Sequence, residues 1–386
     1  MIPYGHQDIT QSDIDAVTDV LKSDFLTQGP AIRDFEIAVS SQVGAAHAIA
    51  TNSATSALHI ACLALGLGKG DYIWTVPNTF VASANCGLYC NANIDFVDID
   101  PDTWNMSVEQ LRKKLSKARK ENRLPKIVIP VHFSGQPTQQ EEIWQLAKEF
   151  DFKIIEDASH AIGASKNNEP VGSCRWSDIT VFSFHPVKII TTGEGGMALT
   201  NNSEIATKMS MLRSHGITRD PELLQCDYDG AGWYYEQQEL GFNYRITDIQ
   251  AALGLSQLQR LDGFISRRTE LANRYNEMLN DLPIKIPTIE DKNKSSWHLY
   301  VVYIMDTGKI NRRQVYDVMR AADIGVNVHY MPVHLQPYYK NLGFTENSFP
   351  VAESHGMQAL SLPLFPGLTK ENQDFVISTL AKAMSC

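Results

Sequence analysis

The chain has 386 residues, of which 43% are hydrophobic and 20% charged, a balance typical of a globular protein with a sizeable core. Its net charge of −10 argues against a nucleic-acid binder, because such proteins usually carry a basic surface. No apolar run approaches the roughly 20 residues that a membrane-spanning helix requires. The N-terminal residues lack a secretory signal and the six cysteines form no CxxC pair, so we expect a cytoplasmic protein with reduced, buried thiols.

The first half of the chain alternates between helix and strand patterns. Helices are predicted at 10–23, with Thr10 as a cap, at 32–43 and at 56–65, in a basic segment around 111–126, and after Thr138. Strands are predicted at 71–76, 94–99, 126–132, 153–156, 179–184 and 196–200. This alternation predicts an α/β fold whose mostly parallel sheet is covered by helices on both faces.

The second half predicts a smaller unit. Two long helices are expected at 247–261 and 264–279, and a polar stretch at 283–296 marks a junction. Beyond it we expect strands at 299–305 and 325–330, a helix capped by Asn311, and a final helix after Thr369. We therefore predict a large α/β domain at 1–262 and a smaller C-terminal α+β domain at 263–386.

The most informative stretch is residues 179–200, ITVFSFHPVKIITTGEGGMALT. It opens as a β-branched and aromatic strand, breaks at Pro186, presents Lys188, turns through GEGG and resumes as an apolar run. A lysine after a buried strand lies near apolar groups that lower its pKa and free the amine to attack a carbonyl. Lysine also forms a Schiff base with pyridoxal 5′-phosphate (PLP). The alternative is a surface lysine beside a turn, because short glycine motifs are weak signals.

Two further segments place suitable groups at the ends of predicted elements. Ala54 and Thr55 begin a helix, where free amides and the helix dipole bind phosphate; N-capping by Asn52 or Ser53 is the alternative. Asp157 follows the strand predicted at 153–156, at the edge where open α/β sheets hold ligands. Its carboxylate can pair with a protonated pyridine nitrogen, whereas the alternative is a cap on the next turn.

Four other residues have both a functional and a structural interpretation. His160 lies just beyond Asp157 and can hydrogen-bond a ring hydroxyl, or it is a structural histidine. Phe80, in PNTFVAS, can stack on a flat ring, although a core position is the alternative. Ser183 and His185 flank the strand end before Lys188, where ordinary loop hydrogen bonds would also suit them.

The segment NVHYMPVH contains His329 and His334, a pair that could suggest a metal. Their spacing is not that of a helical ligand pair, and Pro332 lies between them, so we predict no metal and prefer a substrate-binding segment. Taken together, a phosphate-binding junction, an aromatic residue, an acid, a serine and a lysine follow in order at successive strand ends. That set predicts a PLP site.

The chain also resembles a known family, the PLP-dependent nucleotide-sugar aminotransferases of the DegT/DnrJ/StrS group. The motifs that carry the resemblance span most of the chain: TNSATSAL at 51–58, PNTFVAS at 77–83, EDASHA at 156–161, SFHPVK at 183–188, TTGEGG at 191–196 and GFNYRITDIQAALG at 241–254. The resemblance implies the PLP-dependent transferase fold of aspartate aminotransferase (fold type I), with PLP bound by the large domain. It also implies a homodimer whose active sites lie at the subunit interface.

The resemblance further implies a role for individual residues. Lys188 is the Schiff-base lysine, Asp157 pairs with the pyridinium nitrogen, His160 lies near the ring oxygen, and Phe80 stacks on the ring. The phosphate would be held by Ala54, Thr55 and Ser183, joined by Asn243 from the other subunit. The stretch 219–239 has no counterpart among the family motifs.

Within the family, the chain is most similar to the aminotransferases of pseudaminic acid biosynthesis. The segments that carry this likeness are IPYGHQDI, SDFLTQGP, NSATSALHIACLALGLG and NVHYMPVHLQPYY. The likeness implies a UDP-linked 2-acetamido-2,6-dideoxy-hexos-4-ulose as amino acceptor and L-glutamate as donor. The implied substrate-binding residues are Tyr4, Phe25, Leu26, Thr27, Gln28, His185, Asn327, Val328, His329 and Tyr330.

The implied reaction has two halves, with Lys188 as general acid and base in both. Glutamate first converts PLP to pyridoxamine phosphate, and the 4-keto sugar then receives the amino group. The deoxygenating sugar 3-dehydratases resemble this chain but carry histidine in place of the lysine, so Lys188 argues against them. A scaffold protein that has lost the reaction is disfavoured because both Lys188 and Asp157 are present. Another nucleotide 4-keto- or 3-keto-sugar aminotransferase, dTDP- or UDP-linked, is the remaining alternative.

Overall fold

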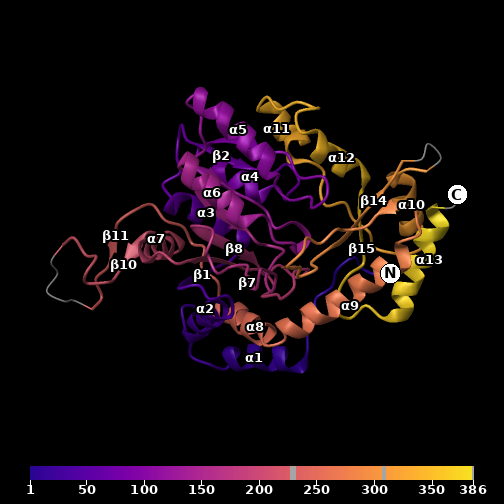
Figure 1. Ribbon diagram of the computed structural model, residues 1–386. Coiled ribbons are helices and arrows are strands. Elements are labelled where there is room, and N and C mark those ends of the chain that lie inside the picture. Colours follow the sequence, from indigo (N-terminus) through magenta and orange to yellow (C-terminus); the bar gives the residue numbers. More distant parts are fainter. Residues whose placement is uncertain (227–231, 307–309, 385–386) are drawn as a thin grey trace.

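A computed structural model describes residues 1–226, 232–306 and 310–384 of the chain (Figure 1). Its centre is a seven-stranded sheet with the strand order β1-β9-β8-β5-β4-β2-β3. The five strands from β8 to β3 run parallel to one another, whereas β9 is antiparallel to both β1 and β8. The mostly parallel sheet predicted from the alternating pattern is therefore confirmed, with an antiparallel edge.

The strands of the central sheet are β1 (His47–Thr51), β2 (Tyr72–Thr75), β3 (Asn93–Phe96), β4 (Ile127–Val128), β5 (Lys153–Asp157), β8 (Ile179–Ser183) and β9 (Gly196–Thr200). The other strands are β6 (Ser165–Lys166), β7 (Glu169–Pro170), β10 (Ile217–Thr218), β11 (Glu236–Gln237), β12 (Ile284–Lys285), β13 (Asn293–Lys294), β14 (Tyr300–Ile304) and β15 (Ala359–Leu362). They form a two-stranded hairpin of β10 and β11 and two three-stranded sheets.

The α-helices are α1 (Gln11–Leu21), α2 (Pro30–Val43), α3 (Ala54–Ala64), α4 (Ala82–Tyr89), α5 (Val108–Lys120), α6 (Gln140–Phe150), α7 (Ser203–Arg213), α8 (Asp248–Leu258), α9 (Leu261–Leu279), α10 (Arg312–Ala321), α11 (Pro337–Asn341), α12 (Pro350–Gln358) and α13 (Lys370–Met384). Two 3₁₀ turns lie at Phe133–Gly135 and Val333–Leu335. The predicted caps are confirmed at Thr10, which forms a capping box with Asp13, and at Asn311, which accepts from the Gln314 amide.

The central sheet is buried on both faces, which explains why every residue of β8 is buried. Val181 on β8 belongs to a cluster with residues of α3, whereas its neighbour Phe182 belongs to a cluster on the other face with residues of α2 and α9. Successive side chains of a strand point to opposite faces, so one short segment anchors both helical layers. The carboxyl end of β8 is thereby held at a fixed position.

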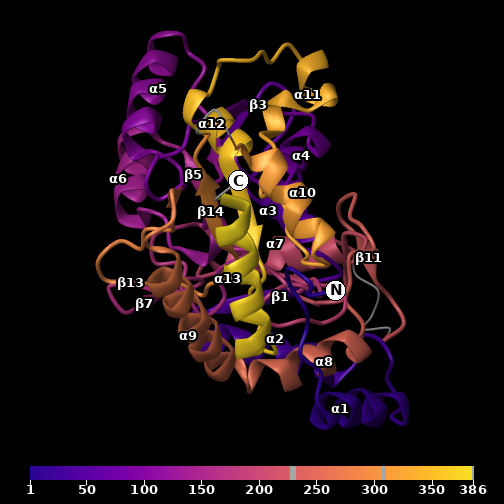
Figure 2. The same ribbon diagram turned by 90° about the vertical axis from the view of Figure 1, so that its right-hand side faces the viewer.

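In the C-terminal part, α10 and α13 pack against the sheet of β12, β14 and β15, which lies at the right in Figure 1. Helices α9 and α13 lie side by side in Figure 2. The N-terminal segment joins this part, because Ile2 bridges to Ile324 and the Leu364 amide donates to the Tyr4 carbonyl at 3.0 Å. Helix α9 begins at Leu261, and the domain boundary at 262/263 stays a prediction.

Two expectations are wrong. Residues 325–330 form no strand, because Ile324 and Asn327 bridge to different partners, Ile2 and Ser361, and the Tyr330 amide donates to the Asn78 side chain instead of to a strand. Cys226 is an exposed thiol, whereas Cys62, Cys86, Cys90 and Cys174 are buried and free as expected. Among the described residues, no helix has the length and apolar character needed to cross a bilayer.

Candidate active site

A cavity of about 990 Å³ opens at the carboxyl ends of β5 and β8. Most of the predicted site residues line it: Tyr4, Ala54, Thr55, Phe80, Asp157, His160, Ser183, His185, Lys188, Asn327, Val328, His329 and Tyr330. These residues come from segments that are far apart in the sequence, and the parallel strands bring them to one edge of the sheet. Phe25, Leu26, Thr27, Gln28 and Asn243 are not among the residues that line the cavity in this chain.

Lys188 lies in the turn after β8, and its amide donates to the His185 carbonyl at 2.9 Å. Burial lowers the pKa of the Lys188 amine to about 8, while the nearby charge of Asp157 acts in the opposite direction. About one amine in ten is therefore neutral at pH 7. The surroundings favour a nucleophilic lysine over the surface lysine of the alternative interpretation.

Asp157 is the last residue of β5, and two donors fix its carboxylate. The Ser83 hydroxyl, on α4, donates to Oδ2 at 2.6 Å, and the Ser159 amide donates to Oδ1 at 3.1 Å. The second contact is the turn cap that we considered as an alternative, and it leaves the carboxylate at the cavity wall. Asp157 is thus oriented by one side chain and one backbone amide.

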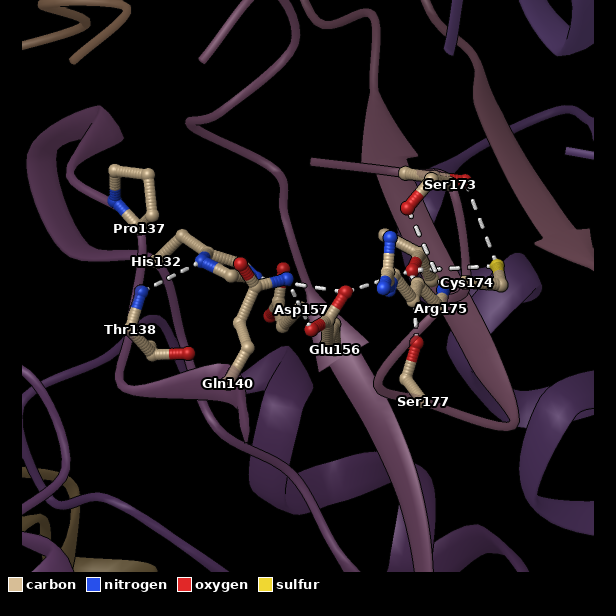
Figure 3. A network of polar contacts seen from close by, with 12 residues as sticks. His132, Pro137, Thr138, Gln140, Glu156, Asp157, Ser173, Cys174, Arg175 and Ser177 are labelled. Atoms are coloured by element: carbon tan, nitrogen blue, oxygen red, sulfur yellow. Dashed lines mark hydrogen bonds and ion pairs between the residues drawn. The ribbon is translucent and has the colours of Figure 1, made fainter. Parts of the chain in front are cut away.

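Glu156 precedes Asp157 and belongs to a buried polar network behind it (Figure 3). Its carboxylate accepts hydrogen bonds from Gln140 at 2.6 Å and from Thr180 at 2.8 Å. Nε2 of His132 lies 3.8 Å away, beyond hydrogen-bond length, while Nδ1 of His132 accepts from the Thr138 amide at 3.1 Å. Burial alone would raise the pKa of Glu156, but His132, Gln140 and Thr180 bring it below its ordinary value. A satisfied carboxylate therefore ties β5 to β8 and α6 directly behind the Asp157 position.

His160 contacts other rings at the cavity wall. Its Nδ1 accepts from the Ser134 amide at 3.3 Å, and its Nε2 lies 3.2 Å from the Tyr330 hydroxyl. Since Nδ1 is the acceptor, the neutral ring carries its hydrogen on Nε2 and donates it to Tyr330. The His298 ring lies 4.3 Å away, centroid to centroid. Burial, followed by the charges of Lys188 and His329, holds the pKa of His160 well below its ordinary value.

The N-terminus of α3 faces the same cavity. Ser53 caps the helix by accepting from the Ser56 amide at 3.1 Å, so N-capping does occur here. The amides of Ala54 and Thr55 belong to the first turn and have no partner within the helix. A Cβ on Gly196 would lie 2.4 Å from the Ala54 nitrogen, so this glycine lets β9 approach the helix start closely. Such a junction suits a phosphate group.

Two aromatic residues and a histidine form the outer wall. Phe80 is 60% exposed, so the core alternative for this residue is wrong and the ring is available to a ligand. Tyr4 lies 5.6 Å from His329, ring centroid to ring centroid. Nδ1 of His329 is 2.7 Å from the Ser361 hydroxyl, and the His329 carbonyl accepts from Nε2 of His355 at 2.7 Å. The 327–330 segment is therefore fixed by side chains, not by a strand ladder.

The remaining predicted residues lie on other surfaces. Thr27 bridges to Thr247, and Phe25 and Leu26 are exposed. Asn243 bridges to Ser214, and its carbonyl lies 3.5 Å from the side-chain nitrogen of the cavity residue Asn52. Asn243 follows the segment that carries β10 and β11, which lies to the left of α7 in Figure 1. Residues 227–231 of the unassigned 219–239 stretch lie outside the described residues.

Sequence reasoning missed two residues of the site, Ser83 and His298. Ser83 stands in the PNTFVAS motif, three residues after Phe80. A helical turn after Phe80 would place Ser83 near the same site, where its hydroxyl contacts Asp157, so the motif was an available signal. His298 lines the cavity from a segment just before β14, and nothing in its sequence surroundings distinguishes it. His334 does not join the cavity wall; its Nε2 pairs with Glu353 at 3.0 Å. No group of three or more possible metal ligands occurs among the described residues.

Residues 7–381 match the family model of the DegT/DnrJ/EryC1/StrS aminotransferases. The UDP-4-amino-4,6-dideoxy-N-acetyl-beta-L-altrosamine transaminase of Campylobacter jejuni is 37% identical, over 98% of this chain and 96% of its own. The spore coat polysaccharide biosynthesis protein SpsC of Bacillus subtilis is 36% identical, with the same two coverages. Among solved structures, Helicobacter pylori PseC, an aminotransferase involved in pseudoaminic acid biosynthesis, superposes with a TM-score of 0.90 at 31% identity, over 100% of this chain and 99% of its own.

Proposed function

Because the chain belongs to the DegT/DnrJ/EryC1/StrS aminotransferase family, we propose that it transfers the amino group of L-glutamate to C4 of a UDP-linked 2-acetamido-2,6-dideoxy-hexos-4-ulose, in pseudaminic acid biosynthesis. The chain is a PLP-dependent nucleotide-sugar transaminase with the fold of its family, and PLP is the cofactor of that family. The names of the Campylobacter jejuni relative and of Helicobacter pylori PseC support the finer assignment.

The residues around the cavity fit PLP in their chemistry. Lys188 offers an amine of lowered pKa for the covalent link, and Asp157 offers a carboxylate for the ring nitrogen. Ala54 and Thr55 offer helix N-terminal amides for the phosphate, with Ser183 beside them at the cavity wall. Phe80 is exposed to the cavity and supplies a surface for ring stacking, and His160 lies on the same wall, where we place the ring oxygen. When bound, PLP supplies the electron sink that makes the α-proton of the amino donor acidic.

The chain's own residues carry out the proton transfers. Lys188 takes the proton from Cα of glutamate and returns it during the donor half-reaction, and repeats these steps in reverse with the keto sugar. The Asp157 carboxylate, oriented by Ser83 and Ser159, keeps the ring nitrogen protonated. Tyr4, His185 and residues 327–330 lie along the open part of the cavity, where we place the sugar nucleotide.

The charges of the cavity support a homodimer with shared sites. Glutamate and a UDP-sugar bring carboxylate and diphosphate groups, which proteins usually bind with cations. Among the described residues that line the cavity, Lys188 is the one lysine and arginine is absent. We therefore propose that a second copy closes the site and supplies further groups, with Asn243 at the phosphate and residues 25–28 at the substrate, although these five residues add hydrogen-bonding and apolar groups and no cation.

The observation that carries the proposal is the convergence of Lys188, Asp157 and the α3 N-terminus on one cavity. The test is to incubate the purified protein with PLP, glutamate and a panel of UDP- and dTDP-linked 4-keto and 3-keto sugars, and to read the products by mass spectrometry. We expect amino transfer to the UDP-linked 2-acetamido-2,6-dideoxy-hexos-4-ulose. Preferential amination of another sugar would favour the alternative, a transaminase for other surface polysaccharide or natural-product sugars. Amination of none would contradict the function.

A further inference from the structure

His298 is a cavity residue that the proposed mechanism does not yet use. It lies on the cavity wall with Lys188, and its side chain is almost completely buried. Its backbone is fixed on both sides, because its amide donates to the Ser134 carbonyl at 3.0 Å and its carbonyl accepts from Arg268 at 3.3 Å. The ring is therefore held at the wall by a rigid backbone and is not a mobile surface group.

The His298 ring has a nitrogen without a hydrogen-bond partner. Its Nδ1 is buried and makes no hydrogen bond to any residue that the structure describes. The other two histidines buried at this cavity differ, since His160 uses both ring nitrogens and His329 pairs with Ser361. A buried polar group without a partner costs folding free energy. A ligand or a neighbouring side chain in its working state would remove that cost.

The charge state of His298 follows from its surroundings. Burial lowers its pKa well below the ordinary value, and the charges of His160, Lys188, Arg268 and His329 lower it further. The ring is thus neutral near pH 7 and carries one N–H and one free lone pair. The carboxylate of Asp157 is engaged by Ser83 and Ser159, whereas Nδ1 of His298 has no partner and the His298 ring lies on the same cavity wall as Lys188.

We propose that His298 is a catalytic residue that accepts a hydrogen bond from the Lys188 ammonium while Lys188 carries the proton of the amino donor. The inference rests on the proposed function, in which Lys188 moves that proton. As the Cα–H bond of glutamate breaks, Lys188 takes the proton and a new N–H bond forms on its amine, and PLP, when bound, would supply the electron sink for the electron pair left behind. The proton later returns to carbon, and no bond to His298 is made or broken. The hydrogen bond stabilises the state in which Lys188 is charged at the cavity wall.

The test isolates the donor half-reaction, in which PLP-loaded protein and glutamate change the cofactor absorbance in a single turnover. His298→Phe keeps a ring but removes the acceptor, so we expect this rate to fall about 10- to 100-fold. We also expect a larger deuterium isotope effect with glutamate labelled at Cα, because proton transfer then limits the rate. Affinity for pyridoxamine phosphate, measured by equilibrium dialysis, should stay unchanged. His298→Asn places an amide acceptor nearby and should recover part of the rate.

His334 offers a matched control. It is also buried with an unpartnered Nδ1, but it lies outside the cavity wall, and Glu353 keeps two backbone donors without it. His334→Phe should leave the half-reaction and its isotope effect unchanged.

The inference is overturned if His298→Phe keeps the rate and the isotope effect, or if it mainly weakens pyridoxamine phosphate binding. If His298→Phe does not fold, the decision rests on His298→Asn. An unchanged rate and isotope effect in His298→Asn would overturn the inference, whereas a slower rate with a raised isotope effect would support it. Wild-type protein that shows no absorbance change with glutamate would instead contradict the proposed function, and the inference with it.

Discussion

Two groups of predicted site residues differ in how the chain places them. Lys188, Asp157 and the start of α3 meet at the end of the central sheet and line one cavity. Asn243 and residues 25–28 lie outside that cavity, next to Ser214 and Thr247. The first group is positioned by buried parallel strands, which a single chain forms by itself. The second group has no such support, and we propose that a second copy brings it to the site.

The largest expected effect concerns the lysine of the first group. Lys188→Ala removes the amine that holds PLP and moves the proton, so turnover should fall by about 10³-fold or more. Pyridoxamine phosphate should still bind, because Asp157 and the α3 amides remain. Amino transfer from glutamate and equilibrium dialysis measure the two properties. Lys153→Ala, which changes an exposed lysine paired with Asp178, is the control and should retain activity. Near-normal turnover of Lys188→Ala would end the assignment.

Asp157→Asn tests the acid of the same group. The amide keeps the shape and can still accept from Ser83, but it removes the charge that keeps the ring nitrogen protonated. We expect turnover to fall about 100-fold, equal to about 2.7 kcal/mol of transition-state stabilisation, with the cofactor still bound. Steady-state kinetics and the cofactor absorbance provide the readouts. An Asp157→Asn protein with wild-type turnover would refute the role.

The pKa of Lys188 predicts how attachment of PLP depends on pH. The neutral amine attacks the aldehyde, and burial lowers the pKa of Lys188 to about 8, so the reactive fraction rises as pH increases through that value. The rate of covalent attachment to PLP-free protein should rise about tenfold between pH 7 and pH 9, as followed by stopped-flow absorbance. Asp157→Asn removes the charge that raises this pKa, so its midpoint should move to lower pH. A midpoint near 10 in the wild-type protein would show that the amine is not buried as described.

Complementation tests the second group. Lys188→Ala and Asn243→Ala are mixed, provided that Asn243→Ala is nearly inactive alone. One site of a mixed dimer receives both changes, while the other keeps its Lys188 and takes Asn243 from the partner chain. Activity should return to at most about half of wild type per mixed dimer. If confirmed mixed dimers restore nothing, Asn243 acts within its own chain and the distinction between the two groups is wrong.

Local sequence signals predicted several elements of the fold, among them those that position the first group. The apolar run before Lys188 became β8, the capping residue Asn311 began α10, and the alternating pattern gave a mostly parallel sheet. The expected strand at 325–330 failed, because its hydrogen bonds go to three separate partners and no local pattern encodes that. His298 was missed for a similar reason, since only the folded chain brings it to the cavity. The placement of Asn243 in the partner's site stays a prediction, because it depends on a second chain.

Borohydride reduction of the PLP-loaded protein, followed by peptide mapping, tests the central claim most directly. Reduction converts a Schiff base into a stable bond, so the modified lysine can be identified by mass spectrometry. We expect one labelled peptide, the one that contains Lys188, and no label in Lys188→Ala. Label on another lysine, or a wild-type protein that binds PLP without any covalent label, would contradict the assignment of Lys188 as the cofactor-binding residue.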